Sequence, residues 1–296
     1  MSSFWHWYIV IPTVLGLVGC FWLLRSNQKG VESDQQAAEK HVWDEDLTEY
    51  NNPLPRWWLN LFLITLAFGA VYLVLYPGLG NFKGFLGWTG LKQYEAEVLS
   101  AETTYGPLYK QYAETSITEL AKNPAAIRTG QRLFSNYCAT CHGSDARGAT
   151  GFPDLRDTEW LYGGTPEAIK TTLTNGRSGV MPPWSAAMDD TTLNAVVEYV
   201  QSLSTGEGNA ELLALGKEKF NTFCIACHGP QGKGNVVLGA PDLTNNIWLY
   251  GGSDRVLLQT LKNGRIGKMP AHGEFLGSDK VHVLSAYVYS LGLKAK

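Results

Sequence analysis

The sequence predicts an all-α protein in which two N-terminal transmembrane helices precede two copies of one small helical unit. Two long uncharged apolar stretches, helical spacing of apolar residues further along, and an internal repeat lead to this fold class. A length of 296 residues suits roughly two domains at ~150 residues each. With 45% hydrophobic residues the chain is too apolar for disorder, and a net charge of −3 indicates no nucleic-acid partner.

The two apolar stretches have the length of membrane-spanning helices. Phe4–Leu24 holds 21 residues and Trp57–Tyr76 holds 20, and neither contains Asp, Glu, Lys or Arg. At about 1.5 Å per residue each reaches ~30 Å, the thickness of the hydrocarbon core of a bilayer. Tryptophan and tyrosine occur near the ends of both, where interfacial aromatic belts are expected. We therefore expect transmembrane helices at 1–24 and 57–77.

The distribution of Lys and Arg predicts the side of the membrane on which each segment lies. The three residues before the first span carry neither. The segment 25–56 carries four such residues: Arg25, Lys29, Lys40 and Arg56. Because the positive-inside rule counts only these residue types, 25–56 is predicted to be a cytoplasmic loop. The N-terminus, and everything from a connector at 78–124 onwards, are then expected on the periplasmic side.

Four of the five cysteines fall in two copies of one motif. Residues 138–142 are Cys-Ala-Thr-Cys-His and residues 224–228 are Cys-Ile-Ala-Cys-His, and C-x-x-C-H is typical of c-type haem attachment. On a helix these cysteines and histidine share one face, so both sulfurs reach one porphyrin while the imidazole faces the iron. A lone C-x-x-C would also suit zinc or a redox dithiol, but two copies each followed by His favour haem. The expected cofactors are two covalently bound c-type haems, attached through Cys138, Cys141, Cys224 and Cys227.

The repeat extends well beyond these motifs. Pro-Asp-Leu recurs at 153–155 and 241–243, Trp-Leu-Tyr-Gly-Gly at 160–164 and 248–252, Asn-Gly-Arg at 175–177 and 263–265, and Met-Pro at 181–182 and 269–270. The offset is 86 residues at the cysteines and 88 at the methionines. The sequence therefore holds a tandem duplication of one unit of ~80 residues. The remaining cysteine, Cys20, is expected to be a small buried hydrophobe in the first span, because no basic residue precedes that span as in a secretory signal.

Two of the four methionines occupy the same repeat position and are the expected axial iron ligands, together with the two motif histidines. Met181 lies 39 residues after His142, and Met269 lies 41 residues after His228. This spacing pairs each methionine with the histidine of its own repeat. His/Met ligation is typical of low-spin electron-transfer haem.

Other residues near the motifs are expected in supporting roles, and none is expected to be catalytic. His272 is a rival to Met269, but its repeat partner is Trp184, so ligation by His272 requires the two sites to differ. The carbonyl of Pro153 or Pro241 is placed to accept the N–H of the haem-binding imidazole. Four residues are candidates for contacts with haem propionates, with core packing and solvated charges as the alternative: Trp160, Trp248, Arg177 and Arg265.

Apolar spacing predicts three helices in each repeat and no strand. The expected helices are Ala125–Phe134, Pro166–Leu173, Leu193–Leu203, Ala210–Phe223, Ser253–Leu261 and Lys280–Leu291. An amphipathic stretch from Leu91 to Lys122 is expected to break at Gly106-Pro107. We expect the two domains at 125–204 and 205–296.

The repeats resemble class I cytochrome c domains by C-x-x-C-H, the proline after it, and the late Met-Pro. The segments on either side of the second span narrow this resemblance. Residues 43–58, WDEDLTEYNNPLPRWW, together with Tyr76-Pro77-Gly78-Leu79-Gly80 and the following Gly84, Gly87 and Trp88, are similar to the CcoP/FixP family. That family is the dihaem subunit of cbb(3)-type cytochrome c oxidases. The resemblance covers about residues 43–296, and many members lack a span like Phe4–Leu24.

The resemblance implies a two-pass subunit of a proton-pumping oxidase in the bacterial cytoplasmic (inner) membrane. The expected partners are the catalytic haem–copper subunit, a monohaem cytochrome c subunit and a donor cytochrome c. Oxygen is then reduced in another subunit, since this chain offers no copper ligands. A free-standing, membrane-anchored dihaem shuttle that serves another reductase or a dehydrogenase is the alternative, because its haem residues would look the same.

The position of the repeats predicts an electron route. The first repeat is tethered nearest the membrane, so electrons are expected to enter at the Cys224/Cys227 haem and pass to the Cys138/Cys141 haem. Residues 130–205 hold five Lys/Arg and eight Asp/Glu, whereas residues 206–296 hold ten and seven. Such an asymmetry between −3 and +3 steers the encounter with a donor of complementary charge.

Overall fold

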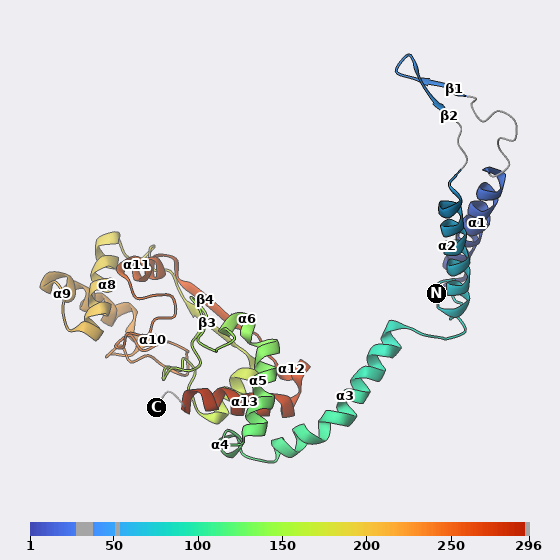
Figure 1. Cartoon of the computed structure of the whole chain (residues 1–296). Helices are drawn as coiled ribbons and strands as arrows, with labels where there is room; N and C mark the ends of the chain where they lie inside the picture. Colours follow the sequence, from blue (N-terminus) through green and yellow to red (C-terminus); the bar gives the residue numbers. More distant parts are fainter. Residues whose placement is uncertain (28–37, 51–53, 294–296) are drawn as a thin grey trace. The chain divides into compact units, whose positions relative to one another are not determined.

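The structure, a computed structural model, describes residues 1–27, 38–50 and 54–293. It divides into two compact units, Met1–Thr103 and Thr104–Lys296. The described residues are mainly helical, which confirms the predicted fold class (Figure 1). Lys29 of the predicted cytoplasmic loop and residues 51–53 of the segment before the second span lie outside the described residues.

Two helices of the first unit are long and apolar enough to cross a membrane. α1 spans Ser3–Asn27 and α2 spans Arg56–Leu75, close to the predicted bounds, and the two helices pack against each other. Almost none of their surface is buried, and large apolar side chains such as Trp57 and Phe68 are exposed. Such surfaces suit contact with lipid or with other apolar helices.

The N-terminal end of α1 lies beside the segment that follows α2. The backbone N–H of Asn81 donates to Nδ1 of His6 over 3.0 Å, and the Asn81 side-chain amide lies 3.4 Å from the carbonyl oxygen of Met1. The two helices therefore form an antiparallel hairpin, in which the N-terminal end of α1 and the C-terminal end of α2 lie together.

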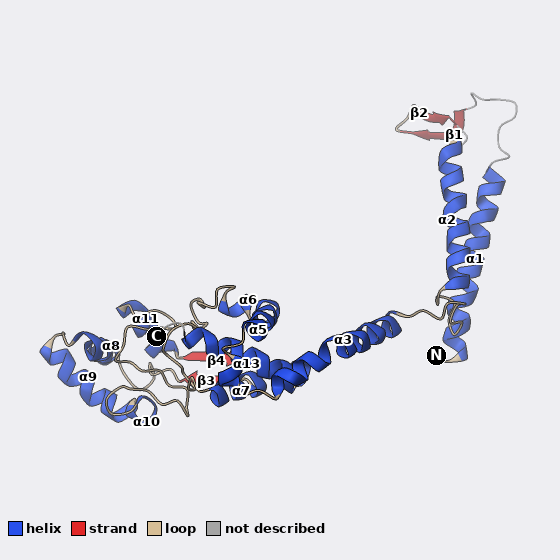
Figure 2. Ribbon diagram, turned by 60° about the horizontal axis from the view of Figure 1, so that its bottom comes forward, coloured by secondary structure: helices blue, strands red, loops and turns tan. Residues whose placement is uncertain are grey.

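The expectation of a chain without strands is wrong in two places (Figure 2). β1 (Ala38–Trp43) and β2 (Leu47–Tyr50) form an antiparallel hairpin between α1 and α2. β3 (Arg177–Met181) pairs with β4 (Arg265–Met269) in the second unit. These strands are too short, and β3 and β4 too interrupted by glycine, for alternation to reveal them in the sequence.

The connector begins with α3, which spans Gly90–Ala113. A break was expected at Gly106-Pro107, but the helix runs through both residues, because a proline removes one backbone hydrogen bond and the helix continues around it. Tyr112 of α3 and Leu120 of the following helix α4 (Ile117–Leu120) are buried against Ala286 of the C-terminal helix.

The other helices of the second unit follow the repeat. They are α5 (Pro124–Tyr137), α6 (Ala139–His142), α7 (Pro166–Asn175), α8 (Asp190–Thr205), α9 (Ala210–Phe223), α10 (Ile225–His228), α11 (Asp254–Asn263), α12 (Gly273–Leu276) and α13 (Ser278–Leu293). All six predicted helices are confirmed to within three residues at each end. Equivalent caps begin α5 and α9, where the side chains of Asn123 and Asn209 accept backbone N–H groups of the first turn.

The two repeats exchange their last helices. α13 of the second repeat packs against α5 and α7 of the first, and α8 of the first packs against α9 and α11 of the second. One hydrophobic cluster therefore joins Phe134 of α5 to Leu173 of α7 and Leu284 of α13. The other joins Phe220 of α9 to Leu193 of α8. The predicted domains at 125–204 and 205–296 follow the sequence repeat, whereas each packed core takes its last helix from the other repeat.

Glycine at one repeat position allows the exchanged helices to cross closely. A Cβ atom added at Gly130 of α5 would lie 2.6 Å from Cβ of Tyr287 and 3.0 Å from the carbonyl oxygen of Val283, both on α13. At the equivalent Gly216 of α9, an added Cβ atom would collide with the carbonyl oxygen of Ala195 on α8. Both crossings therefore depend on a residue without a side chain.

The paired strands carry the chain from one half of the unit to the other. Gly179 lies opposite Gly267, and on either side Arg177 pairs with Met269 and Met181 pairs with Arg265. The register is symmetric about the two glycines, so each strand delivers its methionine end beside the arginine that begins the other strand.

Candidate haem-binding sites

Each C-x-x-C-H motif places one cysteine inside the fold and one at its surface. Cys138 and Cys224 are buried at the starts of the short helices α6 and α10, whereas Cys141 and Cys227 are exposed. None of the four forms a disulfide. We call the pocket around Cys138, Cys141 and His142 the first site and its counterpart around Cys224, Cys227 and His228 the second site.

Burial gives these cysteines the wrong chemistry for a redox dithiol. Desolvation, followed by the neighbouring Cys141, raises the pKa of the Cys138 thiol to about 11. Desolvation and the neighbouring Cys227 likewise raise the pKa of Cys224 to about 11. Reactive C-x-x-C dithiols instead have a lowered thiol pKa. Among the described residues, no three His, Cys, Asp or Glu side chains gather as metal ligands do, so zinc is not favoured either.

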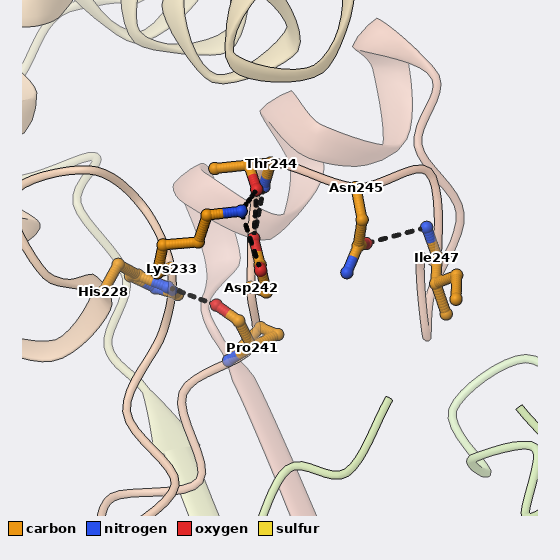
Figure 3. A network of polar contacts seen from close by, with 7 residues as sticks. All are labelled: His228, Lys233, Pro241, Asp242, Thr244, Asn245 and Ile247. Carbon is orange, nitrogen blue, oxygen red and sulfur yellow. Dashed lines mark hydrogen bonds and ion pairs between the residues drawn. The ribbon is translucent and has the colours of Figure 1, made fainter. Parts of the chain in front are cut away.

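The motif histidines are buried and oriented by proline carbonyls, as predicted. Nδ1 of His142 lies 3.0 Å from the carbonyl oxygen of Pro153, and Nδ1 of His228 lies 3.2 Å from that of Pro241 (Figure 3). A carbonyl oxygen only accepts, so Nδ1 carries the proton and the lone pair of the imidazole is on Nε2. This is the tautomer that an axial imidazole requires.

A glycine brings each proline loop close to its motif. Gly148 has a φ of +70°, and an added Cβ atom would lie 2.7 Å from the carbonyl oxygen of Pro153. Its equivalent, Gly234, has a φ of +77° and would meet the carbonyl carbon of Pro241 at 2.6 Å. Only glycine tolerates both the left-handed backbone and this close approach.

Polar contacts stiffen the loop after Pro241. An Asp242 carboxylate oxygen accepts the backbone N–H of Thr244 over 2.7 Å, and Lys233 contacts both of these residues (Figure 3). Burial raises the pKa of Asp242, but the bonds from Thr244 and the charge of Lys233 outweigh it and hold the pKa below its usual value. The carboxylate is therefore ionised at neutral pH and holds the loop beside His228.

The methionines lie in the sites opposite to those expected. Met269 packs against the cluster that contains Cys138, and Met181 packs against the cluster that contains Cys224. The expectation that each methionine shares a site with the histidine of its own repeat is therefore wrong. The strands β3 and β4 cross between the halves and carry the methionines with them (Figure 2).

The backbone after each strand secures this exchange. The N–H of His272 donates to the carbonyl oxygen of Leu173 on α7 over 2.9 Å. The N–H of Trp184 donates to the carbonyl oxygen of Leu261 on α11 over 2.8 Å. These two equivalent bonds attach the segment after Met269 to the first site and the segment after Met181 to the second.

The two predicted tryptophans lie against the hydrophobic clusters of the two sites. Trp160 and Trp248 are partly buried and pack against the first and second clusters. They also line a cavity of about 660 Å³ formed by loops of both repeats, together with Pro153 and Pro241. A cavity of this size is within the range of cofactor and ligand pockets.

The arginines stack on tyrosines that sequence reasoning missed. The Arg177 guanidinium lies 4.7 Å from the ring centre of Tyr162, and Arg265 lies 4.5 Å from that of Tyr250. The signal was present, because each tyrosine belongs to the repeated Trp-Leu-Tyr-Gly-Gly segment. The Tyr162 hydroxyl is buried without a hydrogen-bond partner within the described part of the chain, which fits a site that receives a polar group.

Acidification is expected to loosen both sites. Burial lowers the pKa of His142 and of His228, and their hydrogen bonds to proline carbonyls only partly oppose this. Iron bound at Nε2 would also exclude a proton from that nitrogen. The folded state therefore binds fewer protons than the unfolded state below about pH 6.5, so stability falls as pH decreases. Denaturant titration of the full chain in detergent, followed by the haem absorbance, should show a lower midpoint at about pH 5 than at about pH 7. A midpoint that does not move across this interval contradicts the expectation.

Fold and site together define a class of protein: a membrane-anchored chain with two cytochrome c domains, whose C-x-x-C-H cysteines imply c-type haem. Two family models match the chain. "N-terminal domain of cytochrome oxidase-cbb3, FixP" covers residues 35–83. "Cytochrome C oxidase, cbb3-type, subunit III" covers residues 125–200 and 211–288.

Curated relatives agree. A CcoP subunit of cbb3-type cytochrome c oxidase from Rubrivivax gelatinosus is 46% identical, over 98% of this chain and 95% of the relative. A FixP subunit from Azorhizobium caulinodans is 36% identical, over 85% and 92%. A CcoP subunit from Cereibacter sphaeroides is 35% identical, over 85% and 93%.

The chain belongs to the CcoP/FixP family and is the dihaem cytochrome c subunit, subunit III, of a cbb3-type cytochrome c oxidase. It is therefore an electron-transfer subunit of a membrane oxidase, as the resemblance implied. This decides against the free-standing shuttle. The alignment with the R. gelatinosus relative covers 98% of the chain and so includes residues of α1, the span that many members of the family were expected to lack.

Proposed function

We propose that the chain attaches one c-type haem through Cys138 and Cys141 and a second through Cys224 and Cys227, and that electrons pass between them. One observation carries this proposal. In each site the buried first cysteine of the motif shares a hydrophobic cluster with a methionine from the other repeat, and Nδ1 of the motif histidine is bound to a proline carbonyl. A c-type haem supplies a one-electron iron couple at such a place.

The axial ligands are assigned from this packing. His142 and Met269 serve the first site, and His228 and Met181 serve the second. In both sites the proline carbonyl holds the imidazole, and the thioether of a partly buried methionine raises the potential relative to a second histidine. Each site thus requires residues from both repeats.

The remaining predicted residues act around these ligands. Trp160 and Trp248 shield the sites from water, because both pack on the clusters and line the cavity between the loops of the two repeats. Arg177 and Arg265 are held by stacking and by a hydrogen bond from Nε of each to Thr172 and Thr260, respectively. Such fixed cations beside the strands offset the negative charge of propionates.

We propose that the haem sites lie on the periplasmic side of the inner membrane. Four basic residues in 25–56 support a cytoplasmic loop. The hydrogen bond from Asn81 to His6 supports a common side for the N-terminus and the segment after α2, since it joins these two segments. The catalytic haem–copper subunit, the monohaem cytochrome c subunit and a donor cytochrome c are the proposed partners.

Oxygen uptake tests the assignment to an assembled oxidase. Protein purified in mild detergent through a tag on this chain should contain b-type haem and consume oxygen, sensitively to cyanide, when given a reduced donor. A His142→Ala variant is the control, because it should purify with the same subunits while donor-driven uptake falls towards background. A lone chain with two c-type haems and no uptake would overturn the proposal.

The order of electron transfer is tested in the same complex. A Cys141→Ala or Cys227→Ala variant keeps one unreacted vinyl group, and the longer conjugation shifts the α-band of that haem alone. Rapid mixing with a reduced donor should reduce the haem of the second site before that of the first. Reduction in the opposite order would contradict the proposed route.

A further inference from the structure

The two sites differ in the residue three positions after each methionine. Trp184 follows Met181 by three residues and His272 follows Met269 by three, and both donate an equivalent backbone bond to the helix of the opposite repeat. The two side chains therefore begin at matching places, one in the second site and one in the first.

Their environments differ in chemistry. Trp184 is packed against the second cluster, with its ring centre 5.5 Å from that of Phe223. The ring of His272 lies 5.5 Å from that of Phe275 and is only 8% exposed. Its Nδ1 atom is buried and has no hydrogen-bond partner among the described residues. A buried nitrogen without a partner is costly, so its retention calls for a function.

His272 also belongs to the first site, because its backbone N–H is bound to Leu173 of the cluster that contains Cys138. Burial is the main cause that lowers the pKa of His142, and the charge of His272 lowers it further. No histidine acts in this way on His228, whose pKa is lowered by burial alone against the bond to Pro241. The first site thus holds two imidazoles and a thioether, whereas the second holds one imidazole and a thioether.

We propose that His272 is a second axial ligand for the first site, one that exchanges with Met269 on the iron. This rests on the proposed role of Met269. In the exchange the Fe–S bond breaks and an Fe–N bond forms with no change in iron oxidation state. The binding nitrogen must be unprotonated, so a protonated His272 releases its proton to solvent.

The exchange would keep the iron of the first site low-spin when its bond to the Met269 sulfur breaks, because His272 takes the vacated position. An imidazole favours the oxidised iron and a thioether the reduced iron, so His272 competes best in the oxidised state. Trp184 has no lone pair to offer, since its indole nitrogen only donates. Loss of Met181 therefore leaves the iron of the second site with an open position.

Matched methionine variants of the full chain test this proposal. Oxidised Met269→Ala should lose one sulfur-to-iron charge-transfer band in the far red, yet show no high-spin signal by electron paramagnetic resonance. Met181→Ala should lose one such band and become high-spin, and should bind carbon monoxide when reduced. The stoichiometry of covalent haem shows that each variant has matured.

Two further variants identify the ligand. Met269→Ala with His272→Phe should become high-spin and bind carbon monoxide. Met181→Ala with Trp184→His should return to low-spin. High-spin iron in Met269→Ala alone would overturn the role of His272. Retention of both far-red bands in Met269→Ala would instead overturn the axial role of Met269 itself.

Discussion

Met269→His is expected to lower the midpoint potential of the haem bound at Cys138 and Cys141, although Met269 lies in the other repeat. Met269 packs against the cluster that contains Cys138 and is attached there through the bond from His272 to Leu173. Replacing a thioether by an imidazole favours oxidised iron. The shift should be on the order of 0.1 V, within the ~0.8 V range over which axial ligands set haem potentials.

Redox titration in a Cys141→Ala background measures this effect, because the unreacted vinyl group marks the haem of the first site. The matched variant is Met181→His in a Cys227→Ala background, which should lower the potential of the second haem alone. If Met269→His shifts the haem of its own repeat, the exchanged ligation is wrong and the spacing along the chain was the better guide.

Leu284→Ala is expected to destabilise the first site, and Leu193→Ala the second. Both side chains are completely buried, and each lies in the cluster formed with the opposite repeat. Removal of a buried leucine side chain costs about 2–5 kcal/mol, because apolar burial is lost and a cavity remains. Each variant therefore weakens the pocket whose cysteines belong to the other repeat.

Denaturant titration of the full chain, with absorbance followed at the marked haem, gives the midpoint for each site separately. Leu284→Ala should lower the midpoint of the first site more than that of the second, and Leu193→Ala should do the reverse. Equal losses at both sites in both variants would show that the two cores unfold as one. Losses confined to the repeat that carries the substitution would contradict the exchange of helices.

The sequence predicts the helices of the two repeats well. Helices such as Ala210–Phe223 are set by local spacing and by a capping residue, Asn209, so a single window of sequence contains the necessary information. The prolines were also found, because a motif histidine needs an acceptor at a short distance along the chain. In the structure Nδ1 of His142 and of His228 contacts the carbonyl oxygen of Pro153 and of Pro241, respectively.

The repeat does not determine which closing helix, α8 or α13, packs against α5 and which against α9. α5 and α9 have equivalent faces, so either can receive α8 or α13, and the hydrophobic pattern does not distinguish these pairings. The short link between α8 and α9 determines which helices pair. Only residues 206–209 join α8 to α9, with Gly206 left-handed and Gly208 at a φ of +159°, and so short a link makes the two helices an antiparallel pair. The short Gly-Glu-Gly-Asn link was the overlooked signal.

The exchange of α13 has a consequence for the order in which the protein matures. A ribosome completes residues 124–181 long before residues 278–293, yet the core around Cys138 requires Leu284 and its neighbours on α13. N-terminal domains usually fold first during synthesis, but here the N-terminal core is the one that waits for the end of the chain. The second core has all its helices as soon as α11 emerges. If haem is attached at Cys138 and Cys141 as proposed, it is therefore attached to an open segment, which α13 then closes.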